Sequence, residues 1–170
     1  MYHGPSRISS DLCLASCKLK VMRTLATWLS EYSHDHQNKQ NQRLHIVCVP
    51  VIMATVVGLL HLIAPASGAQ LVGVEIGVGD LLLVTALIWY ATLGLKALSL
   101  MALQLCVSLG LTVLLQHIFG KETVWILLAL FAMTWIGQFY GHKLEGKRPS
   151  FFKDLQYLLI GPLWVWLGHK

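Results

Sequence analysis

The chain has 170 residues and a net charge of +5, and 55% of its residues are hydrophobic while 12% are charged. A soluble domain carries about 25% charged residues, so this composition excludes an ordinary soluble protein and indicates an integral membrane protein of one domain. The basic residues lie almost wholly outside the apolar stretches and are not interleaved with aromatic residues, which excludes a surface for nucleic acid.

Residues 1–21 have a mixed composition, and their apolar run is too short for the core of a secretory signal. We expect a disordered tail or an over-long start, followed by a single membrane domain over residues 22–168. The first segment of that domain has apolar residues at helical spacing, namely Leu25, Trp28, Leu29 and Tyr32. This pattern predicts an N-terminal amphipathic helix in the headgroup region, and it fits a core-facing helix equally well.

Four apolar segments come next, and each approaches the ~20 residues that a membrane-spanning helix needs. They cover residues 44–64, 79–95, 97–119 and 123–141. A fifth apolar segment, 154–168, is short and divided by Gly161 and Pro162, which favours a re-entrant or interfacial position. The predicted fold is therefore an all-α integral membrane protein with about four transmembrane helices.

Lys and Arg gather before the first span and after the fourth, whereas the loop between spans one and two has none. Basic residues favour the cytoplasmic side, and Lys121 is the single exception. An even number of crossings returns residue 142 to the side of residue 45. We therefore expect both polar motifs, residues 32–45 and 138–149, to lie on the cytoplasmic face and to form one site.

Histidines dominate both motifs. His36 and His45 lie in the first motif, and His142 and Glu145, three residues apart, would share one face of a helix. Two or three imidazoles with a carboxylate match the ligands of non-haem Fe(II) oxygenases and of catalytic zinc. A lone histidine at a membrane boundary is usually a solvated interfacial residue, so the metal interpretation depends on the three histidines acting together.

Other polar residues have weaker claims to a role. About 24 Å of helix separates His61 from His45, so His61 can join the same metal site only if the segment around Pro50 is re-entrant. A basic cluster follows His142, and it can bind a substrate carboxylate or anionic lipid headgroups. The cluster consists of Lys143, Lys147 and Arg148.

The two motifs together resemble the 2-hydroxy fatty acid dioxygenase family of small multi-span membrane proteins, over about residues 22–168. The first motif reads Tyr32-x3-His36-x4-Asn41-x3-His45-x4-Pro50, and the second reads Gln138-Phe139-x-Gly141-His142 with Glu145 and Pro149 following. Fungal members place the glutamate four residues after the histidine, whereas here Glu145 comes three after His142. This form resembles the bacterial branch of the family.

The resemblance implies an Fe(II)-dependent reaction in which O2 shortens a 2-hydroxy fatty acid by one carbon. It implies the endoplasmic reticulum in fungi and the inner membrane in bacteria. The resemblance implies that His36, His45 and His142 bind the metal. His61 is a further possible ligand, because the fungal member has a histidine at that place. We expect four further motif residues to act in catalysis: Tyr32, Asn41 and Gln138, which would orient the ligands, and Glu145. Two alternatives stay open: a non-catalytic protein that binds lipid headgroups or a partner, and a zinc-dependent lipid hydrolase.

Overall fold

The structure is a computed structural model that describes residues 24–63, 70–71, 74–75, 77–146 and 151–168. Its elements are helical apart from one antiparallel pair of two-residue strands, β1 (Gln70–Leu71) and β2 (Val74–Glu75). The helices are α2 (Leu25–Asp35), α3 (Lys39–Ile63), α4 (Val78–Thr92), α5 (Leu95–Phe119), the 3-10 turn η1 (Gly120–Glu122), α6 (Thr123–Glu145) and α7 (Phe151–Leu167). The predicted all-α class is confirmed, and the predicted tail 1–21 lies outside the described residues.

Two stretches are long and apolar enough to cross a membrane, Lys39–Leu62 and Leu95–Glu145. The second stretch comprises α5 and α6, because the chain turns back at Gly120, whose φ of 56° suits glycine. Large apolar side chains are exposed along both helices, including Val113, Trp125 and Ile136. So extensive an apolar surface is typical of contact with lipid, and the count of four spans stays a prediction.

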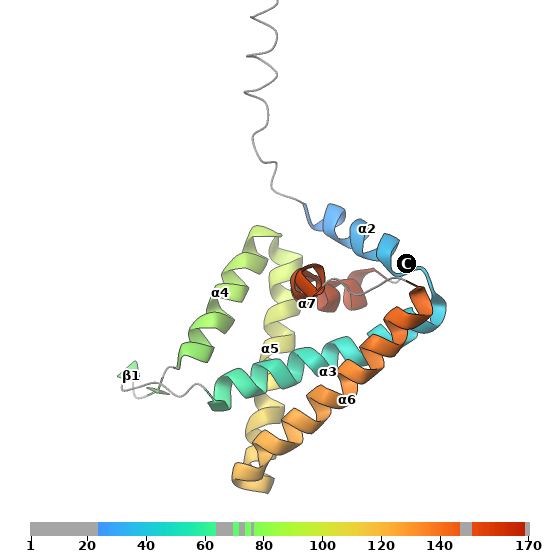
Figure 1. Ribbon diagram of the computed structural model, residues 1–170. Coiled ribbons are helices and arrows are strands. Elements are labelled where there is room, and N and C mark those ends of the chain that lie inside the picture. Colours follow the sequence, from blue (N-terminus) through green and yellow to red (C-terminus); the bar gives the residue numbers. More distant parts are fainter. Residues whose placement is uncertain (1–23, 64–69, 72–73, 76, 147–150, 169–170) are drawn as a thin grey trace, which may run out of the picture.

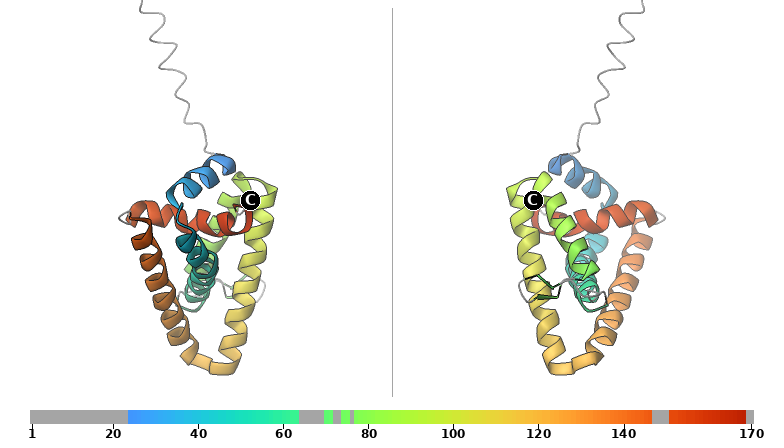
Figure 2. Two further views of the ribbon diagram at one scale, coloured as in Figure 1. Left: turned by 90° about the vertical axis from the view of Figure 1, so that its right-hand side faces the viewer. Right: turned by 90° about the vertical axis from the view of Figure 1, so that its left-hand side faces the viewer.

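Helices α5 and α6 form the two arms of a V, and α3 passes between them (Figures 1 and 2). Helices α2 and α7 lie across the open end of this V, where α7 packs against both α2 and α3. The main core cluster joins α3, α4, α5 and α7 through the buried side chains of Met53, Val57, Tyr90, Met101 and Leu163. This arrangement brings the two polar motifs together at the junction of α2, α3 and α6.

Two differences from the sequence prediction bear on the site. Helix α3 begins at Lys39 rather than at residue 44, so Asn41 and His45 both lie on it. Helix α7 continues through Gly161 and Pro162, so the predicted division at this pair is wrong. A proline inside a helix costs about 3 kcal/mol. Burial of Ile160 and Trp164 against the rest of the bundle offsets that cost.

Candidate metal centre

Three histidines from three different segments meet at this junction. His36 ends α2, His45 lies on α3, and His142 lies near the end of α6. One ligand nitrogen from each ring lies within 4.8 Å of the other two. The ring centroids are 4.5 Å apart for His36 and His45 and 5.2 Å apart for His45 and His142. The structure thus brings together the three histidines that the sequence predicted as ligands.

The backbone fixes the tautomers of two of these rings. Nδ1 of His36 lies 2.8 Å from the carbonyl oxygen of Tyr32, and Nδ1 of His45 lies 3.0 Å from that of Asn41. A carbonyl oxygen only accepts, so both Nδ1 atoms must carry the hydrogen and donate it. The lone pair of each ring is therefore on Nε2. Metal-binding histidines are oriented in this way.

The donor set fits a metal ion. Nε2 of His36 is buried and has no hydrogen-bond partner among the described residues, and a buried polar atom is rarely left unpaired. A metal–imidazole bond is about 2.0–2.1 Å long, so nitrogens bound to one tetrahedral ion lie about 3.4 Å apart. The three ligand nitrogens lie within 4.8 Å of one another, so ring rotations that bring them about 1 Å closer place them around one ion.

The surroundings of His36 favour its neutral imidazole. Burial is the main cause that lowers the pKa of His36, and the neighbouring His142 lowers it further. The backbone bond to Tyr32 acts in the opposite direction without cancelling the effect. Because a metal ion binds the neutral form of histidine, this pKa shift prepares His36 for ligation.

An aromatic wall supports the cluster from the side of α2 and α7. The ring of Tyr32 is 3% exposed and stacks on His36, with centroids 4.1 Å apart and planes 8° apart. Two hydrogen bonds hold α7 against α2: Nε1 of Trp164 donates to Oγ of Ser33 (2.7 Å), and the hydroxyl of Tyr157 donates to Asp35 (3.0 Å). Tyr32 therefore positions His36 through both its ring and its carbonyl.

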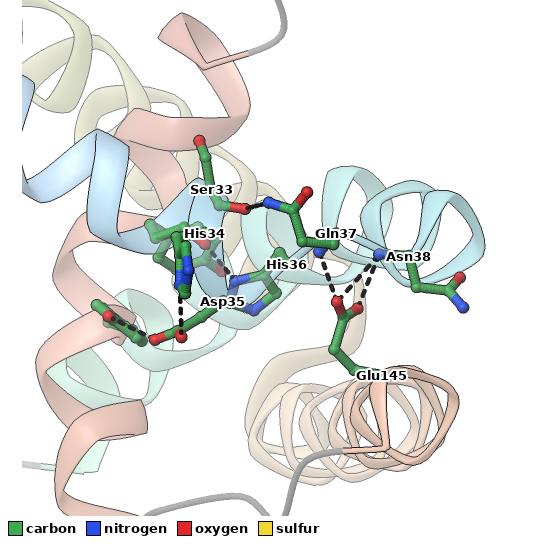
Figure 3. A network of polar contacts seen from close by, with 9 residues as sticks. Ser33, His34, Asp35, His36, Gln37, Asn38 and Glu145 are labelled. Atoms are coloured by element: carbon green, nitrogen blue, oxygen red, sulfur yellow. Dashed lines mark hydrogen bonds and ion pairs between the residues drawn. The ribbon is translucent and has the colours of Figure 1, made fainter.

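Glu145 binds the backbone rather than the histidines. Its carboxylate accepts hydrogen bonds from the backbone N–H groups of Gln37 and Asn38 and from Nδ2 of Asn41, the last at 2.9 Å. Figure 3 shows it reaching from α6 to the turn that precedes α3. A carboxylate at this position caps the free N–H groups at the start of α3 and interacts favourably with the positive end of its helix dipole. Among the described residues, the metal cluster consists of the three histidines.

Asn41 joins α3 to α6 beside the histidines. Its side chain is fully buried, and a Cβ on Gly141 would lie only 2.2 Å from its Oδ1 atom. Only glycine at position 141 allows so close an approach. Asn41 does contact His45, as expected of a residue that orients a ligand, but through its backbone carbonyl rather than its side chain.

A small cavity of about 40 Å³ opens beside His45 and His142. Gln138, which the sequence predicted as a site residue, is 5% exposed and lines it. Trp135 and Tyr157 also line it and were missed by the sequence reasoning. Helical spacing places Trp135 on the same side of α6 as Gln138 and His142, so that signal was present. No sequence signal shows that α7 docks here and delivers Tyr157.

The remaining predicted residues lie apart from the cluster. His61 is near the other end of α3, where its Nδ1 pairs with Asp80 at 3.1 Å, so the structure does not bring it to the histidines. Lys143 is exposed on the last turn of α6. Lys147 and Arg148 lie outside the described residues.

Comparison with known proteins gives one family. A family model described as 2-hydroxy-palmitic acid dioxygenase Mpo1-like matches residues 22–169. No curated protein and no solved structure matches the chain. The resemblance inferred from the two histidine motifs is confirmed by this match over most of the chain. The chain therefore belongs to the 2-hydroxy-palmitic acid dioxygenase Mpo1-like family.

Proposed function

We propose that this protein is an Fe(II)-dependent dioxygenase that shortens 2-hydroxy fatty acids by one carbon. The observation that carries the proposal is the buried Nε2 of His36, which has no hydrogen-bond partner in the part of the chain that the structure describes and lies beside His45 and His142 in a chain of this family. Iron bound by the three imidazoles would keep open positions for O2 and for the hydroxyl and carboxylate of the substrate. The two spanning stretches support a membrane location.

The proposed conversion needs only the substrate and O2. A 2-hydroxy acid anion and O2 give the shortened acid anion, CO2 and water, and this equation balances in atoms and charge. The hydroxyl-bearing carbon and the carboxylate carbon of the substrate together supply all four electrons that O2 accepts. No further reductant is required, so the site needs no second cofactor beside the histidines.

The protein's own residues orient the metal ligands and keep water out. The carbonyls of Tyr32 and Asn41 hold the Nδ1 hydrogens of His36 and His45, which leaves Nε2 of each ring free to bind the metal. The aromatic wall formed by Tyr32, Tyr157 and Trp164 lies beside His36, and His36 and His45 are each 2% exposed. The acyl tail would lie along the apolar helices or in the adjoining leaflet.

For the location we propose a multi-pass protein with both motifs on the cytoplasmic face, in the inner membrane of a bacterium or the endoplasmic reticulum of a fungus. The basic side chain of Lys143 is exposed on the last turn of α6. There it can attract the carboxylate of an incoming substrate or an anionic headgroup.

The test is product analysis. Anaerobically purified protein, loaded with Fe(II) and given 2-hydroxypalmitate and O2, should form pentadecanoate, which mass spectrometry detects. His45→Ala should abolish this product. His34→Ala is the matched control, because the His34 side chain is 85% exposed, and it should retain the activity. An iron-loaded wild type that forms no shortened acid would contradict the proposal.

One observation favours a second candidate, a zinc-dependent lipid hydrolase. The carboxylate of Glu145 is bonded to the turn before α3, so the cluster offers three imidazoles without a carboxylate. Three histidines are the ligand set of some catalytic zinc sites. Ester hydrolysis by zinc-loaded protein, with no O2 consumption by the iron-loaded form, would favour this candidate.

A further inference from the structure

Trp135 carries a buried hydrogen-bond donor that no described residue satisfies. Its indole lines the cavity that His45 and His142 also line. The Nε1 atom is buried and has no hydrogen-bond partner among the described residues. Indole nitrogen can only donate, so this N–H is free to bind an acceptor that is brought to the neighbouring cavity.

Two neighbouring rings limit the orientation of the indole. Its ring lies against those of Phe131 and Phe139, one helical turn away on either side, with centroid distances of 6.0 and 5.4 Å. Residues at this spacing are neighbours on a helix surface. These ring contacts therefore restrict the rotation of the indole beside the cavity.

The cavity suits a small acceptor group. A water molecule needs about 10–15 Å³ of such space, so a volume of about 40 Å³ admits a carboxyl or hydroxyl group but not an acyl chain. Among the described lining residues there is no Lys or Arg. An anionic head in this place would have to be neutralised by the metal and by neutral donors.

We propose that the indole N–H of Trp135 donates a hydrogen bond to a carboxylate oxygen of the 2-hydroxy acid head, beside the three histidines. The buried amide of Gln138, on the same side of α6, supplies a second neutral donor to the same head. This inference rests on the proposed function and names the residues that recognise the substrate. Hydrogen bonds to a charged acceptor are the stronger kind, so this contact contributes to substrate affinity.

The first test is Trp135→Phe, which keeps an aromatic ring and removes the N–H. The KM for 2-hydroxypalmitate should rise about tenfold, which corresponds to about 1.4 kcal/mol, while kcat and the metal content change little. Trp125→Phe is the control, because Trp125 lies on the same helix and is 68% exposed. The same substitution should raise the KM for the methyl ester of the substrate less than the KM for the acid.

The second test uses the wild type and keeps the inference falsifiable if Trp135→Phe does not fold. The indole N–H signals of zinc-loaded, 15N-labelled protein are followed during titration with 2-hydroxyoctanoate. The Trp135 signal, assigned from the backbone, should move downfield while that of Trp125 stays in place. An unmoved Trp135 signal with bound ligand would overturn the inference.

The outcomes also separate this inference from the proposed function. Active wild type with an unchanged KM in Trp135→Phe overturns the inference alone, and the N–H is then satisfied by a trapped water. Iron-loaded wild type that neither binds nor converts 2-hydroxy acids overturns both. A raised KM with unchanged metal content, together with the downfield shift, supports both.

Discussion

Gly141→Ala tests whether the contact between α3 and α6 sets the spacing of the histidines. The added methyl carbon would lie 2.2 Å from Oδ1 and 3.3 Å from Cγ of Asn41. Ordinary contacts between such atoms are about 3.5 Å long, so the shortfall is about 1.3 Å. The Asn41 side chain is fully buried and its Nδ2 is bonded to Glu145. Either that bond breaks or the two helices move apart.

The displacement is large compared with what a metal site tolerates. Metal–ligand distances vary by about 0.2 Å, so a shift of this size prevents His45 and His142 from binding one ion together. We expect metal affinity to fall about 10- to 100-fold, as for the loss of a residue that orients a ligand. Overpacking should also cost about 1–3 kcal/mol of folding stability, which outweighs the gain of about 1 kcal/mol from replacing glycine in a helix.

The assay is competition for the metal with a chelator, combined with thermal unfolding in detergent. Gly110→Ala is the matched control: Gly110 lies on α5, and a Cβ there would meet no atom within 4 Å. That variant should keep the metal affinity of the wild type and be slightly more stable. Wild-type metal affinity in Gly141→Ala would refute the idea that this contact positions the histidines.

Three further predictions concern the surroundings of the cluster. Glu145→Ala should cost about 0.5–2 kcal/mol of stability through the lost cap of α3 and should weaken metal binding. Glu145→Gln should retain part of the stability and part of the metal affinity, and equal losses in the two variants would contradict the capping role. Tyr32→Ala should cost about 3–5 kcal/mol of folding stability through the cavity that it leaves, and it should let the ring of His36 move. Chelator competition should then show weaker metal binding, and unchanged metal binding would contradict the positioning role. The pKa of His36 is lowered from its ordinary value of 6.5, so below about pH 6.5 the unfolded chain binds more protons than the folded one, and the metal-free protein should lose stability as pH falls. Thermal midpoints between pH 8 and pH 5 should show a smaller loss in His36→Gln than in the wild type or His34→Gln, and equal losses in all three would contradict this account.

The convergence of the three histidines could be predicted from the sequence. Short loops and the predicted even number of crossings lead us to expect His142 on the same side as His45, and the separation of His36 from His45 allows a turn between them. The physical reason is simple: a chain whose apolar segments must lie side by side leaves few arrangements for its polar ends. The structure brings the three rings together as that argument expects.

The role of Glu145 could not be predicted in the same way. Its spacing from His142 shows that the two residues share a side of α6, which suggested a shared role at the metal. The carboxylate caps α3 instead, and this depends on α3 beginning at Lys39. Helix starts are among the least certain features that a sequence offers.

Helix α7 shows another limit of sequence reasoning. The apolar pattern of residues 154–168 is compatible with several positions in a membrane bundle. Docking against α2 and α3, which brings Tyr157 and Trp164 to the site, is decided by side-chain packing between distant segments. Packing of this kind follows from complementary shapes rather than from local spacing.

The central claim is that His36, His45 and His142 hold one iron ion together. The most direct test is the iron and zinc content of anaerobically purified protein, measured for the wild type, His45→Ala and His142→Ala, with the exposed His117 replaced by alanine as a control. We predict a stoichiometric amount of iron in the wild type and in the control, and its loss in both site variants. Wild type that stays metal-free after loading with Fe(II), or iron that persists in His142→Ala, would contradict the claim.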